Sequence, residues 1–165
     1  MRPDKYDIEK PEVCRVCGGE CCKRMPGSSI PSDFAEPLEE SVFQALMSGR
    51  WALDWWEGDP LDEGDLSICY YLRPKIAGHD ELEHGAWMGD GPCSWWTEKG
   101  CAEPLENRPF VCRVLIPFID EDGDLECDPP EGLPASKEDS ALAWRPHQDV
   151  IKRALDRAKK ERGDA

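Results

Sequence analysis

Four of the nine cysteines of this chain lie close together near its start, in the stretch Cys14-Arg15-Val16-Cys17-Gly18-Gly19-Glu20-Cys21-Cys22. Two residues separate Cys14 from Cys17, which is the spacing at which two thiolates turn toward one ion. The glycines that follow allow backbone N–H groups to approach the sulfurs. This pattern is typical of a metal site, and it predicts a chain that folds around bound metal.

Three more cysteines occur far along the chain, at Cys93, Cys101 and Cys112. Seven thiols exceed the needs of one tetrahedral ion. Either two ions share bridging sulfurs, or one ion takes four thiolates and the others surround it. Since the adjacent side chains of Cys21 and Cys22 diverge, we expect these two residues to serve different ions.

The cellular compartment affects how the cysteines are interpreted. No apolar run approaches the roughly 20 residues that a membrane helix needs, and residues 1–7 do not resemble a secretion signal. These features predict a cytoplasmic protein with no membrane partner. Disulfides are rare in the cytoplasm, so we interpret the thiols as ligands or redox groups. A disulfide framework is the alternative, and the odd number of cysteines argues against it.

The charge of the chain disfavours another class of partner. The sequence has 35 acidic and 20 basic residues, and its net charge is −15. Nucleic-acid affinity depends largely on the neutralisation of phosphates by Lys and Arg. We therefore expect no nucleic-acid partner, and the expected partners are metal ions and another protein.

The expected fold is a small irregular α+β domain, organised around a cysteine-rich metal site, with a C-terminal helix. A length of 165 residues suits one domain with its own core. We divide the chain into a lead-in (1–13), a cysteine-cluster domain (14–127) and a linker with the C-terminal helix packed on the same domain (128–165).

The first half of the chain predicts a helix and two strands. Helical spacing of apolar residues predicts a helix over 33–48, and aromatic and β-branched residues predict strands over 51–56 and 66–72. The apolar face of the helix would consist of Leu38, Val42, Ala45 and Leu46.

The second half is expected to be less regular. A loop over 77–92 would lead to a short strand over 93–96, and a turn at 97–100 would present Cys101. Two prolines restrict the segment before Cys112 to a short helical turn. An apolar segment over 113–119 then precedes residues 120–124, which we interpret as a hairpin turn and not as a calcium loop, because the glycine stands at the wrong position.

The C-terminal segment predicts a capped helix start at 136–139 and a further helix that begins at Pro146. Val150, Ile151, Leu155 and Ala158 would form its apolar stripe. The basic residues are expected to face water, with favourable charge at the end of the helix; they are Lys152, Arg153, Arg157, Lys159, Lys160 and Arg162.

The order of these motifs resembles that of a known family. The N-terminal cluster, Cys93 with Cys101, and the later stretch Arg108-Pro109-Phe110-Val111-Cys112-Arg113 are similar to those of the YkgJ-type cysteine-cluster proteins. That family is described as a zinc- or iron-chelating domain. The resemblance covers residues 14 to about 117. Two departures are a slightly longer interval before Cys112 and tryptophans after Cys93, where the family usually has residues such as Phe and Leu.

The resemblance implies a set of metal ligands for zinc or iron, with an iron–sulfur cluster as one form of the iron site: Cys14, Cys17, Cys21, Cys22, Cys93, Cys101 and Cys112. Arg108 and Arg113 flank the last ligand and are expected to donate to thiolates, although a salt bridge with a carboxylate is the alternative. Cys69 is expected to be a buried strand residue. Cys127 is left open as an eighth ligand.

Three functions follow from this reading. The first is a protein whose zinc or iron is structural and whose surface engages another protein. The second is a redox protein or enzyme with an iron–sulfur or multinuclear iron site, as in the related motif of flagellin lysine methylases. The third is a metal store or chaperone. We favour the first, since no nucleophile–base pair or cofactor loop occurs outside the cysteines.

Overall fold

The computed structural model describes residues 26–58, 64, 67–83, 91–119, 121–123, 125–128, 133 and 135–164. Its helices are α3 (Leu38–Met47), α4 (Phe110–Val114), α5 (Lys137–Trp144) and α6 (Gln148–Arg162), with 3-10 turns η2 (Pro31–Asp33), η4 (Leu105–Asn107) and η5 (Arg145–His147). Its strands are β1 (Trp51–Glu57), β2 (Ile68–Pro74), β3 (Trp96–Thr97), β4 (Gly100–Cys101), β5 (Ile116–Ile119) and β6 (Leu125–Asp128). The fold is α+β with a C-terminal helix, as predicted.

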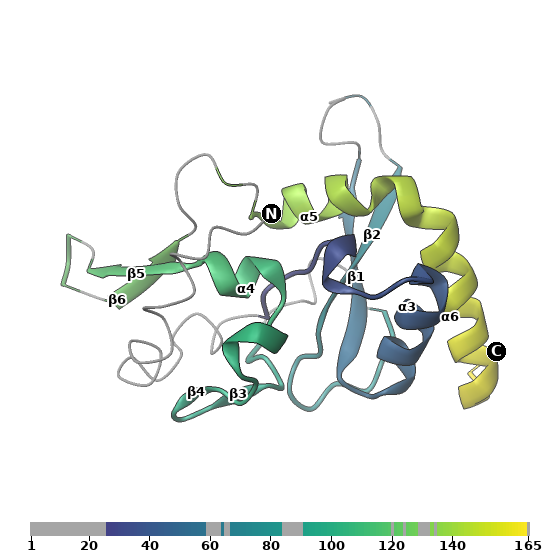
Figure 1. Cartoon of the computed structure of the whole chain (residues 1–165), viewed down its shortest axis with the longest axis horizontal. Helices are drawn as coiled ribbons and strands as arrows, with labels where there is room; N and C mark the ends of the chain where they lie inside the picture. The colour runs from purple at the N-terminus through teal and green to yellow at the C-terminus, as the bar shows by residue number, and fades with distance from the viewer. Residues whose placement is uncertain are drawn as a thin grey trace.

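The hairpin β1–β2 occupies the middle of the molecule, with α3 and α6 on one side of it and α4 with the two smaller hairpins on the other (Figure 1). Its strands are antiparallel, with Trp51 opposite Pro74 and Glu57 opposite Ile68. The strand predicted over 51–56 is confirmed with one added residue. The strand predicted over 66–72 is shifted by two residues, to Ile68–Pro74.

The main core lies between this hairpin and the helices α3, α5 and α6. All four apolar residues predicted on α3 are buried, and three of those predicted on α6 join them. The fourth, Val150, is half-buried. Trp144 at the end of α5 is fully buried in the same core. Helical periodicity therefore identified the core-facing sides of the two long helices correctly.

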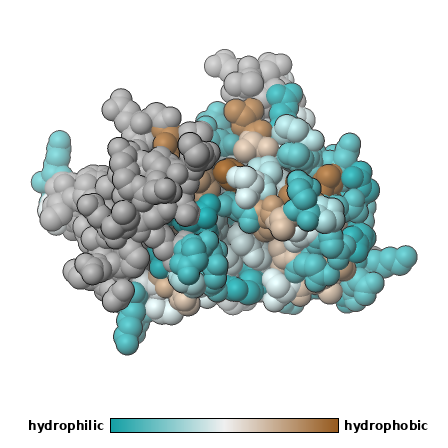
Figure 2. All heavy atoms as spheres, viewed as in Figure 1, coloured by the Kyte–Doolittle hydropathy of each residue, from teal (hydrophilic) through white to brown (hydrophobic). Residues whose placement is uncertain are grey.

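The basic side chains of α6 are exposed or half-buried, and several of them pair with nearby acids. Arg153 Nε lies 2.9 Å from Glu39 Oε2, and Arg157 Nη1 lies 3.1 Å from Glu40 Oε2. Both carboxylates belong to α3. Hydrophilic residues therefore cover much of the coloured surface over these helices (Figure 2), and the basic run helps to hold α6 on α3.

The sequence predicted the capped start of α5, and the two ends of α6 have recognisable chemistry. Ser136 accepts a hydrogen bond from Asp139 N and forms the reciprocal capping box with the Asp139 carboxylate. Gly163 ends α6 in the left-handed conformation, at a φ of 76°. The predicted start at Pro146 is the turn η5, and α6 continues from it. Each helix in the described ranges is too short or too polar to span a bilayer.

Two predicted boundaries differ from the structure. The helix expected over 33–48 begins only at Leu38, because Pro37 lacks an N–H group and the residue before a proline avoids helical geometry. The strand expected over 93–96 is wrong. Cys93 forms an isolated bridge with Ile76, Trp96 N donates to Cys93 O in a turn, and the strand β3 begins only at Trp96.

The region after Cys101 contains the expected helical turn, η4, but it also contains α4, which the sequence did not predict. The apolar segment expected over 113–119 is divided between α4 and β5. β5 pairs with β6 across the hairpin turn predicted at 120–124. Val111 and Val114 of α4 pack with Ala135 in a second, smaller core cluster.

A short buried segment, residues 26–30, joins the two sides of the molecule. Ser29 donates two hydrogen bonds to Leu72 O, one from its backbone N at 3.1 Å and one from its hydroxyl Oγ at 2.7 Å. Trp144 Nε1 donates to Ser29 O at 2.9 Å, and Ser140 Oγ donates to Ser28 Oγ at 2.7 Å. This segment is therefore fixed to the outer edge of β2 and to α5.

The hairpin also buries a charged pair. Arg73 Nε donates to Asp54 Oδ2 at 2.9 Å, and both side chains are almost fully buried. Tyr71 lies opposite Asp54, and its buried hydroxyl is close enough to that carboxylate for the two groups to interact, although it makes no hydrogen bond of good geometry within the described residues. Burial and the nearby Asp54 charge raise the pKa of Tyr71 above its ordinary value.

Replacement of Arg73 by methionine is expected to destabilise the fold by about 3–5 kcal/mol, because it leaves the buried Asp54 charge without a partner. The matched control is Arg153→Met, which breaks an exposed ion pair and should cost at most about 1 kcal/mol. Urea unfolding of both variants measures the difference, and equal losses would contradict the importance of the buried pair.

The raised pKa of Tyr71 predicts a loss of stability in alkali. Above pH 10 the unfolded chain releases the phenol proton while the folded protein retains it, so the free energy of unfolding falls as pH rises. Tyr71→Phe should make this decline shallower between pH 9 and pH 11, as measured by urea unfolding at each pH. An unchanged slope would show that other groups cause the decline.

Candidate metal centre

Cys112 lies in α4, and Asp33 positions this helix from a distant part of the chain. The Asp33 carboxylate accepts hydrogen bonds from Phe110 N at 3.0 and 3.1 Å and from Arg113 Nη2 at 3.0 Å. The first N–H groups of a helix lack partners within it, so Asp33 caps α4. Asp33 could not be recognised as this cap from the sequence, because it lies 77 residues from Phe110 and capping patterns involve neighbouring residues.

Gly27 packs directly against the sulfur of Cys112. A Cβ atom added at Gly27 would lie well within the van der Waals contact distance of Cys112 Sγ. The buried segment 26–30, which follows the N-terminal cysteine cluster in the sequence, therefore passes over this sulfur. The one sequence feature that reflects this contact is the glycine itself, because any larger residue at position 27 would meet the sulfur.

The other two late cysteines lie on neighbouring elements. Cys93 is buried, and its backbone pairs with Ile76 next to the end of β2. Cys101 is half-buried at the end of β4, opposite Trp96. No disulfide joins these residues to one another or to Cys112. Within the described ranges no three His, Cys, Asp or Glu residues form a group that could hold a metal ion.

The four early cysteines, Cys14, Cys17, Cys21 and Cys22, lie outside the described residues. Whether they meet the late cysteines therefore stays a prediction. Cys69 is buried in β2, as expected. Cys127 stands in β6, with its backbone opposite Pro117.

The structure places both predicted arginines near Cys112 and gives each an oxygen partner. Arg113 forms the ion pair with Asp33, which is the carboxylate alternative that the sequence left open. Arg108 is nine-tenths buried, and its Nε donates to the carbonyl oxygen of Glu103 at 2.9 Å. That bond holds the loop before α4 in a compact turn.

A cleft of about 370 Å³ opens beside α4. Residues 32–33, 50–51 and 106–109 line it, together with Trp95, Glu103 and Arg113. Trp95 packs edge-on against Trp51 with ring centroids 5.0 Å apart, and Arg50 lies over its ring. The walls of the cleft therefore consist of fixed aromatic rings and charged side chains.

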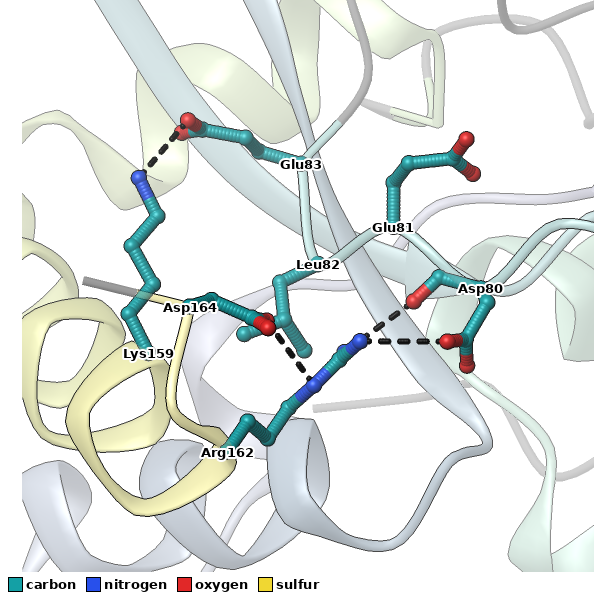
Figure 3. Close-up of a pocket in the computed structure, with 7 residues that line it drawn as sticks. All are labelled: Asp80, Glu81, Leu82, Glu83, Lys159, Arg162 and Asp164. Atoms are coloured by element: carbon teal, nitrogen blue, oxygen red, sulfur yellow. Dashed lines mark hydrogen bonds and ion pairs between the residues drawn. The ribbon is translucent and has the colours of Figure 1, made fainter.

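A second hollow, of about 420 Å³, lies between the end of α6 and residues 80–83 (Figure 3). Lys159 pairs with Glu83 at 2.9 Å, and Arg162 reaches both Asp80 and Asp164. The hydrogen bond with Glu83 raises the pKa of Lys159. Because the cations of this hollow are occupied by its own carboxylates, we interpret the cluster as a fastening for α6.

The contact between Gly27 and Cys112 predicts that a larger residue at position 27 lowers the stability of the protein. Gly27→Ala should destabilise the protein by about 1–3 kcal/mol, because the new methyl group must displace the sulfur or the segment 26–30. In a Cys112→Ala background the same change should cost less than about half as much. Urea unfolding of the four proteins tests this, and an equal cost in both backgrounds would refute the contact.

Comparisons with known proteins add no family assignment. No family model matches the chain, and no match was found among curated proteins or among solved structures. The function of the chain must therefore be argued from its own residues and their arrangement.

Proposed function

We propose that this chain is a cysteine-cluster protein of the YkgJ type that binds zinc or iron through thiolates of Cys14, Cys17, Cys21, Cys22, Cys93, Cys101 and Cys112. The metal in this proposal is mainly structural. It joins the N-terminal cluster to the region of α4 and the hairpin β3–β4, and it leaves the outer surface to engage another protein.

The observation that carries the proposal is the packing of Gly27 on Cys112 Sγ. Only four residues separate Gly27 from Cys22 in the sequence, so chain connectivity limits their Cα atoms to a separation of about 18 Å. Hydrogen bonds of Ser28 and Ser29 fix the direction of this segment. This limit allows Cys22 to approach Cys112, and the proposal is that the cysteine-rich stretch does so through the shared metal.

The chemistry of the late cysteines agrees with this proposal. Cys112 is half-buried and Cys93 is buried, so thiolates there would be sheltered from bulk water. Metal binding requires deprotonated thiols, and an isolated buried thiolate would be costly without a cation. Bound zinc or iron would supply that positive charge. The proposal places the protein in the cytoplasm, where reducing conditions keep the thiols available.

The decisive measurement is the metal content of cysteine variants purified without oxygen. Cys17→Ser and Cys112→Ser should each lower the metal bound per chain and destabilise the fold, because each removes a ligand. The control is Cys69→Ser, in which a buried cysteine of β2 is changed and metal content should stay the same. Elemental analysis gives the metal, and equal metal loss in all three variants would contradict the ligand assignment.

The absorption spectrum of the same preparation separates the candidate functions. A colourless protein with stoichiometric zinc would support a structural site and remove the iron–sulfur alternative. A brown protein with sulfur-to-iron charge-transfer bands would favour a redox protein or an enzyme. Release of metal to a weak chelator without unfolding would favour a metal store or chaperone.

A further inference from the structure

The cleft beside α4 contains three arginines, and two of them are neutralised by carboxylates of the same cleft. Arg50 pairs with Glu103, and Arg113 pairs with Asp33 at 3.0 Å. Asp33 is further occupied as the cap of α4, since it accepts from Phe110 N. These two carboxylates are therefore already engaged by the two paired arginines.

Arg108 differs from these two arginines. It is nine-tenths buried, and its only hydrogen bond in the described part of the chain runs from Nε to Glu103 O. No carboxylate pairs with it there; the remaining acid of the cleft, Glu106, is exposed and forms no ion pair with it. The terminal nitrogens of Arg108 are not among the enclosed atoms, so they remain accessible while the rest of the side chain is buried. Arginine remains charged at any ordinary pH, and within the described residues this charge has no carboxylate counter-ion.

Trp95 supplies a second unsatisfied donor in the same cleft. Its side chain is 6% exposed, and its Nε1 atom is buried without a hydrogen-bond acceptor among the residues that the structure describes. The ring cannot easily turn to find one, because it packs against Trp51 on one side and beneath Arg50 on the other. Buried donors without acceptors are rare in folded proteins and indicate a missing partner.

We propose that this cleft binds a small oxyanion, a carboxylate or a phosphate group, through the guanidinium of Arg108 and the indole N–H of Trp95. Both side chains only donate hydrogen bonds, so their ligand must supply acceptors. The planar guanidinium presents paired N–H groups that match two oxygens of such an anion. The cleft volume of about 370 Å³ lies within the usual range for small-molecule sites.

This inference goes beyond the proposed metal site and does not depend on it. Arg108 and Trp95 both lie in the described part of the chain, and neither is a thiol. A chain that binds no metal could still bind an oxyanion at this cleft. The two experiments use different variants and different measurements, so their failures are distinguishable.

Titration calorimetry of the purified full chain with inorganic phosphate, and separately with succinate, tests the proposal at fixed ionic strength set with sodium chloride. At least one anion is expected to bind with a dissociation constant of about 1 mM or tighter. Phosphate alone would assign a phosphate-bearing ligand, and succinate alone a carboxylate. Absence of binding by both anions beyond the chloride control would overturn the proposal.

Variants then locate the bound anion. Arg108→Gln should weaken binding at least about tenfold, while Arg153→Gln, which removes an exposed arginine of α6, should leave it unchanged. If Arg108→Gln fails to fold by circular dichroism, Trp95→Phe decides, because it removes the N–H donor while keeping an aromatic ring between Trp51 and Arg50, and it should also weaken binding. The missing indole signal of Trp95→Phe identifies Trp95 in the NMR spectrum, and this signal should move on titration. Equal affinity in the folded variants would place the anion elsewhere and refute the assignment.

Discussion

The hydrogen bonds of residues 28 and 29 are the constraint on which the arrangement of this protein depends. Ser29 attaches the chain to β2, and Trp144 Nε1 closes over its carbonyl oxygen. A buried backbone group that lost these partners would be left unsatisfied, which is costly in a core. The segment therefore has one position, and that position places Gly27 on the sulfur of Cys112.

Asp33 extends the same constraint to α4. The carboxylate accepts from Ile30 N, which belongs to the fixed segment, and from Phe110 N at the start of the helix. One side chain thus ties the position of the segment to the orientation of the helix that carries Cys112. The Asp33 carboxylate is almost fully buried, and its ion pair with Arg113 strengthens this link. A helix of five residues would be marginal without such tertiary contacts.

Local patterns predicted the parts of this fold that depend on local chemistry. The apolar periodicity of α3, the aromatic residues of β1 and the cap at Ser136 each reflect neighbouring residues, and the structure confirms them. The elements that were missed or misplaced depend on distant partners. α4 forms because Asp33 caps it from far along the chain. The backbone of Cys93 pairs with Ile76 in an isolated bridge instead of extending into a strand.

The same distinction applies to the candidate sites. Spacing could nominate the cysteines, because metal ligands repeat at recognisable intervals. It could not reveal that Gly27 touches Cys112, or that Asp33 pairs with Arg113 while Arg108 has no carboxylate partner among the described residues. Those facts concern which side chains meet in space. The motif Arg108-Pro109-x-x-Cys112-Arg113 presents its two arginines as equivalent, whereas their surroundings give them different chemistry.

Two separate apolar clusters support the part of the molecule that the structure describes. The hairpin β1–β2 shares a large buried cluster with three helices, which includes the fully buried Trp144. Around α4 the described residues form a second cluster of Val111, Val114 and Ala135, against which Phe110 and Leu133 pack. Small domains commonly use a bound metal as a further staple between their elements. Because α4 carries Cys112, a metal held there would add to the tertiary contacts that Asp33 already gives this short helix.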